Sequence, residues 1–164
     1  MKNLIFDLDL TLVDSTIAES ARKARDWPRV YSLIPQFRLY DGIPIVLDYI
    51  RKNEIKTAIV STAPSSYVRR VVDYFGMPIN AIVGYHDALR KPSPDGMIKA
   101  AGILGGSITE TISFGDRVID ILASNSAGIK SVSCFWGTQE AQALRSTNSI
   151  KIYSPIDILS CISY

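Results

Sequence analysis

The sequence has 164 residues, of which 47% are hydrophobic and 21% are charged, and its formal net charge at pH 7 is +2. This length suits one domain with a single hydrophobic core, so we expect residues 1–164 to form one unit. The composition is that of an ordinary globular protein, and the small net charge alone gives no argument for a nucleic-acid or membrane partner.

The sequence indicates neither secretion nor insertion into a membrane. Its two cysteines, Cys134 and Cys161, are too few for a disulfide framework. Near the N-terminus, Asp7 and Asp9 interrupt the continuous apolar stretch that a signal peptide needs. No apolar run approaches the length of a membrane span. We therefore expect a cytoplasmic protein with no membrane partner.

Six short segments rich in β-branched and other apolar residues are expected to form strands. Most of them are apolar at consecutive positions, which is typical of strands covered on both faces in a parallel sheet. In chain order, the segments are residues 4–6, 57–61, 81–85, 111–114, 131–135 and 150–153.

Between these segments, apolar residues recur at the spacing of one helix face. Gly76, Gly102 and Gly128 stand where such helices are expected to stop. The alternation of strand and helix predicts an α/β fold, a three-layer doubly wound (Rossmann-like) parallel sheet. The predicted helices cover residues 43–50, 68–75, 97–104 and 119–126.

One segment, residues 15–39, interrupts this alternation. We interpret it as a small helical cap insertion over the site, so that the core comprises residues 1–14 and 40–164. Its basic residues suit a solvated helix face, and attraction of a polyanionic substrate is the alternative interpretation. These basic residues are Arg22, Lys23, Arg25, Arg29 and Arg38.

Polar residues follow the ends of four predicted strands. In a parallel sheet these ends point the same way, so we expect the side chains to meet in one crevice. The residues are Asp7, Asp9 and Thr11 after the first strand, Ser61 and Thr62 at the second, His86, Asp87 and Lys91 after the third, and Asp116, Arg117 and Asp120 after the fourth.

Such a group of residues has a chemical use. Crowded carboxylates repel one another unless a hard divalent cation neutralises them, and Mg²⁺ prefers oxygen ligands. One carboxylate can attack a phosphoryl group, and a second can protonate the leaving oxygen and then activate water. A lysine and a hydroxyl group would stabilise the charge on the transferred oxygens.

Four parts of the chain resemble the four motifs of the haloacid dehalogenase superfamily, in the same order. They are Asp-Leu-Asp-Leu-Thr at 7–11, Ser61, Lys91-Pro92, and Gly-Asp-Arg-Val-Ile-Asp at 115–120. The resemblance covers nearly the whole chain. It implies a phosphoric monoester hydrolase that uses Mg²⁺ and acts on a phosphorylated substrate. Asp9 favours the phosphatase branch, because dehalogenase members lack an acid there.

The resemblance also implies a role for each matched residue. Asp7 would be the nucleophile and a metal ligand, and Asp9 the general acid/base, with its backbone carbonyl reaching the metal. Lys91 would hold the nucleophile and the phosphate together. Asp116 would ligate Mg²⁺ directly, and Asp120 would support either the metal or Lys91.

The remaining matched residues would have supporting roles. Ser61, with Thr62 able to share its function, would bind a phosphoryl oxygen, and Thr11 would brace the loop after the first strand. Arg117 has two interpretations, pairing with Asp120 or contact with the substrate. For His86, a structural role is favoured over contact with the substrate.

Other functions compatible with this sequence are a phosphomutase of the same superfamily and a non-catalytic phospho-acceptor or binding module.

The insertion is much shorter than the cap of many members of the superfamily, which would leave the crevice open. Two explanations fit an open crevice. The substrate is bulky or polyanionic, such as a nucleotide or the phosphorylated end of a nucleic acid, or a second subunit closes the site.

Overall fold

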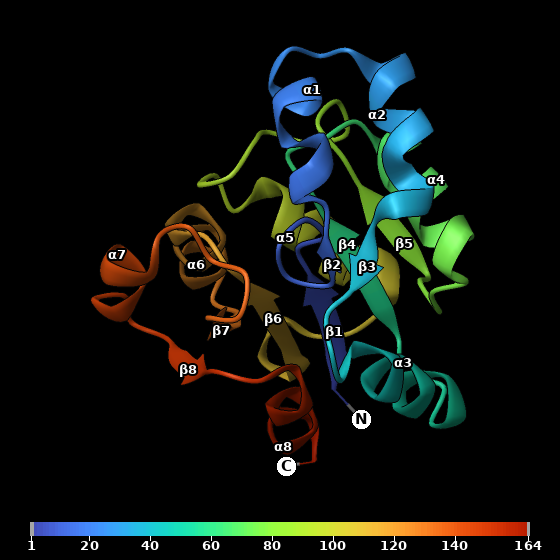
Figure 1. Cartoon of the computed structure of the whole chain (residues 1–164). Coiled ribbons are helices and arrows are strands. Elements are labelled where there is room, and N and C mark those ends of the chain that lie inside the picture. The colour runs from blue at the N-terminus through green and yellow to red at the C-terminus, as the bar shows by residue number, and fades with distance from the viewer. Residues whose placement is uncertain (1, 164) are drawn as a thin grey trace.

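A computed structural model describes residues 2–163 and contains one six-stranded sheet (Figure 1). The order of the strands is β5-β4-β1-β6-β7-β8, and each neighbouring pair is parallel. All six predicted strands are present, which confirms the doubly wound α/β fold. Their bounds are β1 Asn3–Phe6, β4 Thr57–Val60, β5 Ala81–Val83, β6 Thr111–Gly115, β7 Lys130–Cys134 and β8 Ile150–Ile152.

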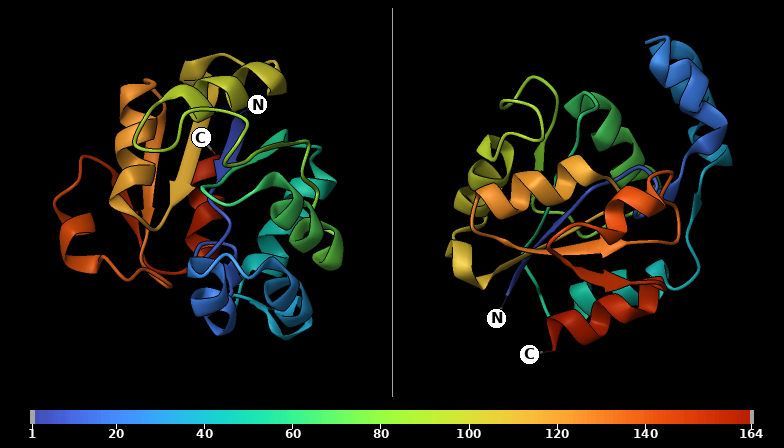
Figure 2. Two further views of the ribbon diagram at one scale, coloured as in Figure 1. Left: turned by 90° about the horizontal axis from the view of Figure 1, so that it is seen from above. Right: turned by 90° about the vertical axis from the view of Figure 1, so that its left-hand side faces the viewer.

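Helices cover both faces of the sheet, as the two views in Figure 2 show. Side chains of β1 alternate between two apolar cores: Leu4 and Phe6 belong to one, and Ile5 to the other. This alternation follows from the two-residue period of a strand. The first core also includes residues of α3 (Ile43–Lys52), α4 (Ser65–Phe75) and α8 (Ile158–Ile162), and the second includes residues of α5 (Asp95–Leu104) and α6 (Val118–Ser126).

The glycine positions predict the ends of the helices only in part. Gly76 adopts a left-handed conformation directly after α4, as expected of a helix-ending glycine. The expectation that Gly102 ends a helix is wrong, because α5 continues through Leu104, whose side chain is buried, and ends before Gly105. Gly128, with φ of 76°, lies two residues beyond the end of α6.

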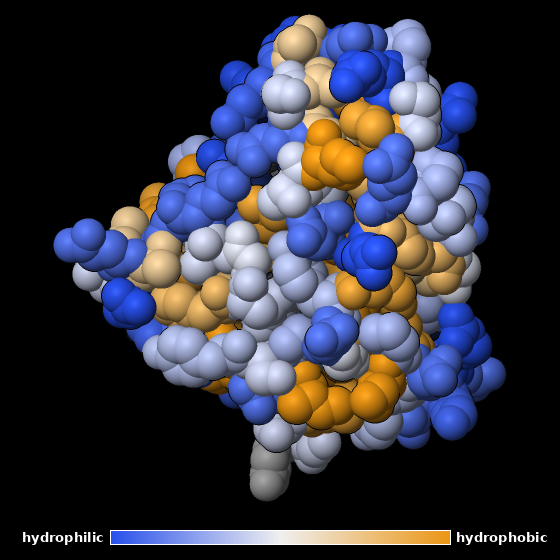
Figure 3. Space-filling model, in the orientation of Figure 1, coloured by the Kyte–Doolittle hydropathy of each residue, from blue (hydrophilic) through white to orange (hydrophobic). Residues whose placement is uncertain are grey.

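Two short helices were not predicted, namely α7 (Ala141–Arg145) and α8. Each has five residues, which is too short for the apolar repeat of a helix to be recognised. Within residues 2–163, no helix is long and apolar enough to cross a membrane. On the face seen in Figure 3, hydrophobic residues form separate groups among hydrophilic ones, and one group lies toward α3 and α8.

The segment after β1 leaves the sheet and returns to it through two short antiparallel strands, β2 (Val13–Asp14) and β3 (Arg38–Leu39). Between them lie the helices α1 (Glu19–Lys23) and α2 (Trp27–Leu33). Asp26 caps α2, because its carboxylate accepts the backbone N–H of Arg29. In Figure 1, both helices lie beyond the carboxyl end of β1, where a doubly wound sheet binds its ligands.

Candidate active site

A crevice of about 1130 Å³ opens at the carboxyl end of the sheet, between the core and the helix α1. It is bordered by residues after β1, β4, β5 and β6, so the topology gathers the predicted strand-end residues as parallel strands should. Thr11 is fully buried and does not line the crevice. The predicted residues that line the crevice are Asp7, Asp9, Ser61, Thr62, His86, Lys91, Asp116, Arg117 and Asp120.

The loop after β1 places Asp7 and Thr11. The backbone N–H of Asp7 donates to the carbonyl of Phe114 at 2.9 Å and so continues the pairing of β1 with β6 by one residue. Leu10 has a φ of 65°, a conformation that is uncommon for residues other than glycine, and the chain turns there. The Thr11 hydroxyl then donates to Asp116 Oδ1 at 2.9 Å, which ties this loop to the end of β6.

Three carboxylates form an acidic cluster in the crevice. One oxygen each of Asp7, Asp116 and Asp120 lies within 4.8 Å of the other two. Asp116 is 1% exposed and Asp120 is 4% exposed, so water screens their repulsion poorly. An oxygen-rich, negatively charged group of this kind suits a hard divalent cation such as Mg²⁺.

Lys91 is the only buried cation beside this cluster in the part of the chain that the structure describes. Its Nζ lies 3.2 Å from Asp7 Oδ1 and 2.6 Å from Asp120 Oδ1. Burial disfavours the ammonium ion, but the carboxylates of Asp120 and Asp7 more than compensate and raise the pKa of Lys91 above its ordinary value. Lys91 therefore remains charged while it holds two members of the cluster.

Asp120 is fixed by the start of α6. Its second oxygen accepts the backbone N–H of Arg117 at 2.9 Å, as an acid in the first turn of a helix often does. Gly115 makes room for this arrangement, because a Cβ at that position would lie 2.4 Å from the Asp120 Cβ. The glycine before Asp116 therefore has a steric function in the site.

Burial and mutual repulsion perturb the acids of the cluster. Burial raises the pKa of Asp7 to about 6, against the opposing attraction of Lys91. Burial, together with repulsion from Asp7 and Asp120, raises the pKa of Asp116 to about 10. Such shifts mean that the charges of Asp7 and Asp116 are poorly compensated by the protein alone, which is the condition that a bound cation relieves.

The Asp9 carboxylate points away from this cluster and toward the insertion. Its Oδ1 accepts hydrogen bonds from the hydroxyls of Ser15 at 2.6 Å and Tyr67 at 2.7 Å. Its Oδ2 lies 3.1 Å from Nη1 of Arg22 on α1. The acidic cluster therefore contains the side chains of Asp7, Asp116 and Asp120, while Asp9, which is expected to reach the metal with its backbone carbonyl, keeps its carboxylate outside the cluster.

Ser61 and Arg117 have well-defined partners. Ser61 is 7% exposed, lies one residue beyond β4, and accepts the backbone N–H of Ala63 at 3.0 Å with its hydroxyl oxygen. Arg117 contacts Asp120, as one of its two interpretations proposes, but through its backbone N–H. The guanidinium instead pairs with Glu140 at 3.1 Å, and only the backbone of Arg117 contacts Asp120.

Two guanidinium groups flank one aromatic ring at the mouth of the crevice. Arg25 of the insertion lies 6.0 Å from the ring centroid of Tyr85, and Arg90 lies 5.1 Å from it. The ring of His86 meets the ring of Tyr85 edge-on, with 4.7 Å between the two ring centroids. Among residues 2–163, neither Arg25 nor Arg90 has a carboxylate within 4.0 Å. We call Arg25, Tyr85 and Arg90 the cationic rim.

Several residues of the site were not predicted from the sequence. Tyr67 and Ser15 hold Asp9, and Thr138 donates its hydroxyl to the carbonyl of Asp116. Thr138 lies in the loop after β7, so the strand-end argument points to its loop, although Ser61 directly follows β4 and Thr138 comes later in its loop. Tyr67 is the third residue of α4 and gives no such signal.

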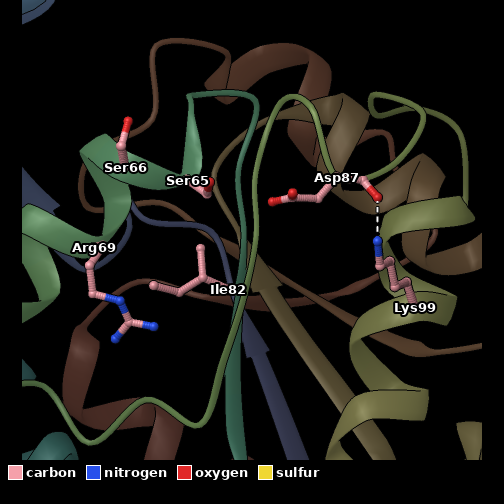
Figure 4. A pocket seen from close by; sticks show the side chains of 6 residues that line it. All are labelled: Ser65, Ser66, Arg69, Ile82, Asp87 and Lys99. Carbon is pink, nitrogen blue, oxygen red and sulfur yellow. Dashed lines mark hydrogen bonds between the residues drawn. The ribbon is translucent and has the colours of Figure 1, made fainter.

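A second pocket of about 430 Å³ lies beside α4 and the loop after β5 (Figure 4). It contains Asp87, whose carboxylate accepts the backbone N–H of Gly84 at 2.8 Å and whose carbonyl accepts the ammonium of Lys99. None of the three clustered acids lines this pocket. Asp87 is thus outside the acidic cluster.

The chain is similar to several known proteins. A family model, that of the haloacid dehalogenase-like hydrolases, matches residues 16–134, well over half of the chain. A phosphoglycolate phosphatase from Xanthomonas campestris is 30% identical over 105 residues, which are 62% of this chain and 48% of that protein. A phosphoglycolate phosphatase from Xylella fastidiosa is 28% identical over 127 residues, 68% of this chain and 56% of that protein. The chain therefore spans about half the length of these curated relatives.

Among solved structures, a haloacid dehalogenase-superfamily hydrolase of subfamily IA from Geobacter sulfurreducens superposes with a TM-score of 0.80 at 17% identity. The superposition covers 98% of this chain and 99% of that one. At 17% identity, this similarity shows a shared fold and nothing more.

Proposed function

The chain belongs to the haloacid dehalogenase-like hydrolase family, and from this membership we propose that it is a Mg²⁺-dependent phosphatase with Asp7 as its nucleophile. The observation that carries the proposal is the arrangement of Asp7. Its carboxylate lies beside two buried acids and is held by Lys91 at 3.2 Å. A carboxylate in this setting is suited to attack a phosphoryl group whose charge is neutralised by neighbouring cations.

The acidic cluster would hold the metal ion. Asp7, Asp116 and Asp120 supply oxygen atoms only, which fits Mg²⁺, and the raised pKa values of Asp7 and Asp116 show how poorly the protein alone compensates their charges. When bound, the ion would neutralise charge on the phosphoryl oxygens. The Thr11 hydroxyl, which donates to Asp116, would keep that ligand oriented.

The reaction would proceed in two transfers. An oxygen of Asp7 attacks phosphorus and forms an aspartyl phosphate, while the leaving oxygen takes a proton from Asp9. Asp9 then removes a proton from water, which attacks phosphorus and releases inorganic phosphate from Asp7. Lys91 and Ser61 would stabilise the phosphoryl oxygens in both transfers, because an ammonium group and a hydroxyl group can both donate to them.

The cationic rim indicates which class of substrate the site would bind. Among residues 2–163, Arg25 and Arg90 have no carboxylate within 4.0 Å, so they would attract an additional anionic group on the leaving alcohol. We infer a phosphate ester that carries a second charge, and a nucleotide or the phosphorylated end of a nucleic acid meets this condition. The relatives named above are phosphoglycolate phosphatases, whose namesake ester also carries a second anionic group.

Release of phosphate from 4-nitrophenyl phosphate tests the proposal. We expect release that requires Mg²⁺ and is abolished by Asp7→Asn, because an amide is a far weaker nucleophile than a carboxylate. Asp87→Asn is the matched control, since that acid lies outside the cluster, and it should remain active. Full activity of Asp7→Asn would contradict the assignment of the nucleophile.

A further inference from the structure

Donors from three separate parts of the chain surround the carboxylate of Asp9. Arg22 comes from α1, Tyr67 from α4, and Ser15 from the segment that enters the insertion. The side chains of Arg22 and Asp9 are only 19% and 12% exposed. Their ion pair is therefore partly desolvated, so water screens the attraction between the two charges less than on an open surface.

The insertion is anchored on the helix that supplies Tyr67. The ring of Trp27 packs on Tyr67 with a centroid distance of 5.6 Å, and the guanidinium of Arg70 lies 4.1 Å from the ring centroid of Tyr31. The Tyr31 hydroxyl is also 3.3 Å from the Ser66 hydroxyl. Because Tyr67 touches both Trp27 and Asp9, the position of the insertion and the orientation of Asp9 are fixed by the same side chain.

The two oxygens of Asp9 are bound unequally. Oδ1 accepts two hydroxyl hydrogens, whereas Oδ2 has only Arg22, through Nη1 at 3.1 Å. The Arg22 Nε is buried and has no hydrogen-bond partner among residues 2–163. The guanidinium is thus held at Oδ2 by a single contact. The two hydroxyls occupy both lone pairs of Oδ1, whereas Oδ2 keeps one lone pair that faces no donor among residues 2–163.

We propose that Arg22 is a positioning residue for acid/base catalysis, so that the short insertion serves the chemical step through Asp9. Arg22 directs Oδ2 of Asp9 toward the leaving oxygen, to which Asp9 gives its proton, and Asp9 later recovers one from the attacking water. This inference rests on the proposed phosphatase activity. It assigns a specific function to one of the five basic residues of the insertion.

The dependence of rate on the leaving group tests this assignment. An alkyl phosphate needs a proton on its leaving oxygen, whereas 2,4-dinitrophenyl phosphate does not. For Arg22→Met we expect kcat on an alkyl phosphate to fall at least about 10-fold, in the range of the contribution of a general acid. The burst of dinitrophenolate measured before steady state should change less than about threefold, and Arg22→Lys should restore part of the alkyl activity.

Matched variants complete the design. Arg29→Met makes the same change at an exposed position of the insertion outside the crevice and should leave both rates unchanged. If Arg22 acts through Asp9, Arg22→Met should add no further loss to Asp9→Asn on the alkyl phosphate. Thermal unfolding of each variant establishes that it is folded before its rates are compared.

Equal losses on the two substrates, no loss on either, or a further loss in the double variant would each overturn the role of Arg22. A failure of the underlying function is distinguishable, because the wild-type protein would then release no phosphate in the presence of Mg²⁺. The wild-type protein should release phosphate, and Asp9→Asn should lose activity on the alkyl phosphate. If both do so while Arg22→Met shows no selective loss on the alkyl phosphate, only the role of Arg22 is overturned.

Discussion

Lys91 lies closer to Asp120 than to Asp7: its ammonium nitrogen is 2.6 Å from Asp120 Oδ1 and 3.2 Å from Asp7 Oδ1. Asp120 thus holds the lysine that reaches the proposed nucleophile. Asp120 is itself fixed by the backbone of Arg117 at the start of α6. The chain of contacts runs from a helix terminus, through an acid and a lysine, to Asp7.

Replacing Asp120 should impair catalysis through this chain of contacts. In Asp120→Asn, Lys91 loses its closest anionic partner and the acidic cluster loses one charge. We expect kcat for 4-nitrophenyl phosphate to fall about 10- to 100-fold, as is typical when a residue that orients a ligand is changed. Steady-state kinetics across a Mg²⁺ titration measure this effect. Unchanged kcat at saturating Mg²⁺ would contradict it.

The acidic cluster should make the stabilising effect of Mg²⁺ depend on pH. The pKa values of Asp7, about 6, and Asp116, about 10, lie above the ordinary value near 4, so the folded metal-free protein binds these protons more tightly than the unfolded chain. Their contribution to stability is therefore fully present below pH about 4 and is lost as the pH rises through about 6 and toward 10.

Mg²⁺ would replace those protons, so we expect it to raise the melting temperature more at pH 8 than at pH 5. Thermal unfolding at both pH values, with and without Mg²⁺, measures this. Asp116→Asn removes one of the two groups and should weaken the pH dependence. A Mg²⁺ effect of the same size at both pH values would show that these carboxylates do not bind the ion.

Gly115→Ala should damage the site without changing any charge. The new Cβ would lie 2.4 Å from the Asp120 Cβ, so the carboxylate or the end of β6 must move. We expect a loss of stability of about 1–3 kcal/mol together with reduced phosphatase activity. Denaturant unfolding and phosphate release measure the two effects.

Gly102→Ala is the matched control for that variant. Gly102 lies inside α5, and a Cβ at that position would meet nothing within 4 Å outside its own helix, so alanine should stabilise the helix by up to about 1 kcal/mol and leave activity unchanged. If both variants behaved alike, close packing at Gly115 would not matter for the site.

The cationic rim should affect substrate selection more than chemistry. For Arg90→Ala we expect KM for a nucleoside 3′,5′-bisphosphate to rise about tenfold, the equivalent of one charged contact, with kcat little changed. KM for 4-nitrophenyl phosphate, which lacks the second anionic group, should stay within about twofold. Equal rises for both substrates would place Arg90 at the reacting phosphate instead.

The sequence predicts the sheet and the acidic cluster well because both follow from local patterns. Short apolar runs identify all six strands, and the parallel topology then brings Asp7, Asp116, Asp120 and Lys91 together. The chain gives no comparable signal for α7 and α8, which are shorter than two helical turns, nor for the stop of α5, where burial of Leu104 extends the helix past Gly102.

The environment of Asp9 shows where such prediction stops. Asp9 is expected to act as an acid/base and to reach the metal with its backbone carbonyl. No sequence pattern predicts that its side chain contacts Tyr67, which is 58 positions away in the chain, and Arg22 of the insertion. The orientation of a side chain depends on tertiary contacts that neither periodicity nor motif spacing contains. For the same reason, the pairing of Arg117 with Glu140 appears only in the structure.

Detection of the covalent intermediate tests the central claim most directly. The protein would be mixed with Mg²⁺ and 2,4-dinitrophenyl phosphate, quenched in acid within milliseconds, and mapped by peptide mass spectrometry. We predict one phosphoryl group on Asp7, which disappears in Asp7→Asn. A phosphoryl group on Asp87 or another residue, or substrate turnover with no phosphoryl group on Asp7, would contradict the account.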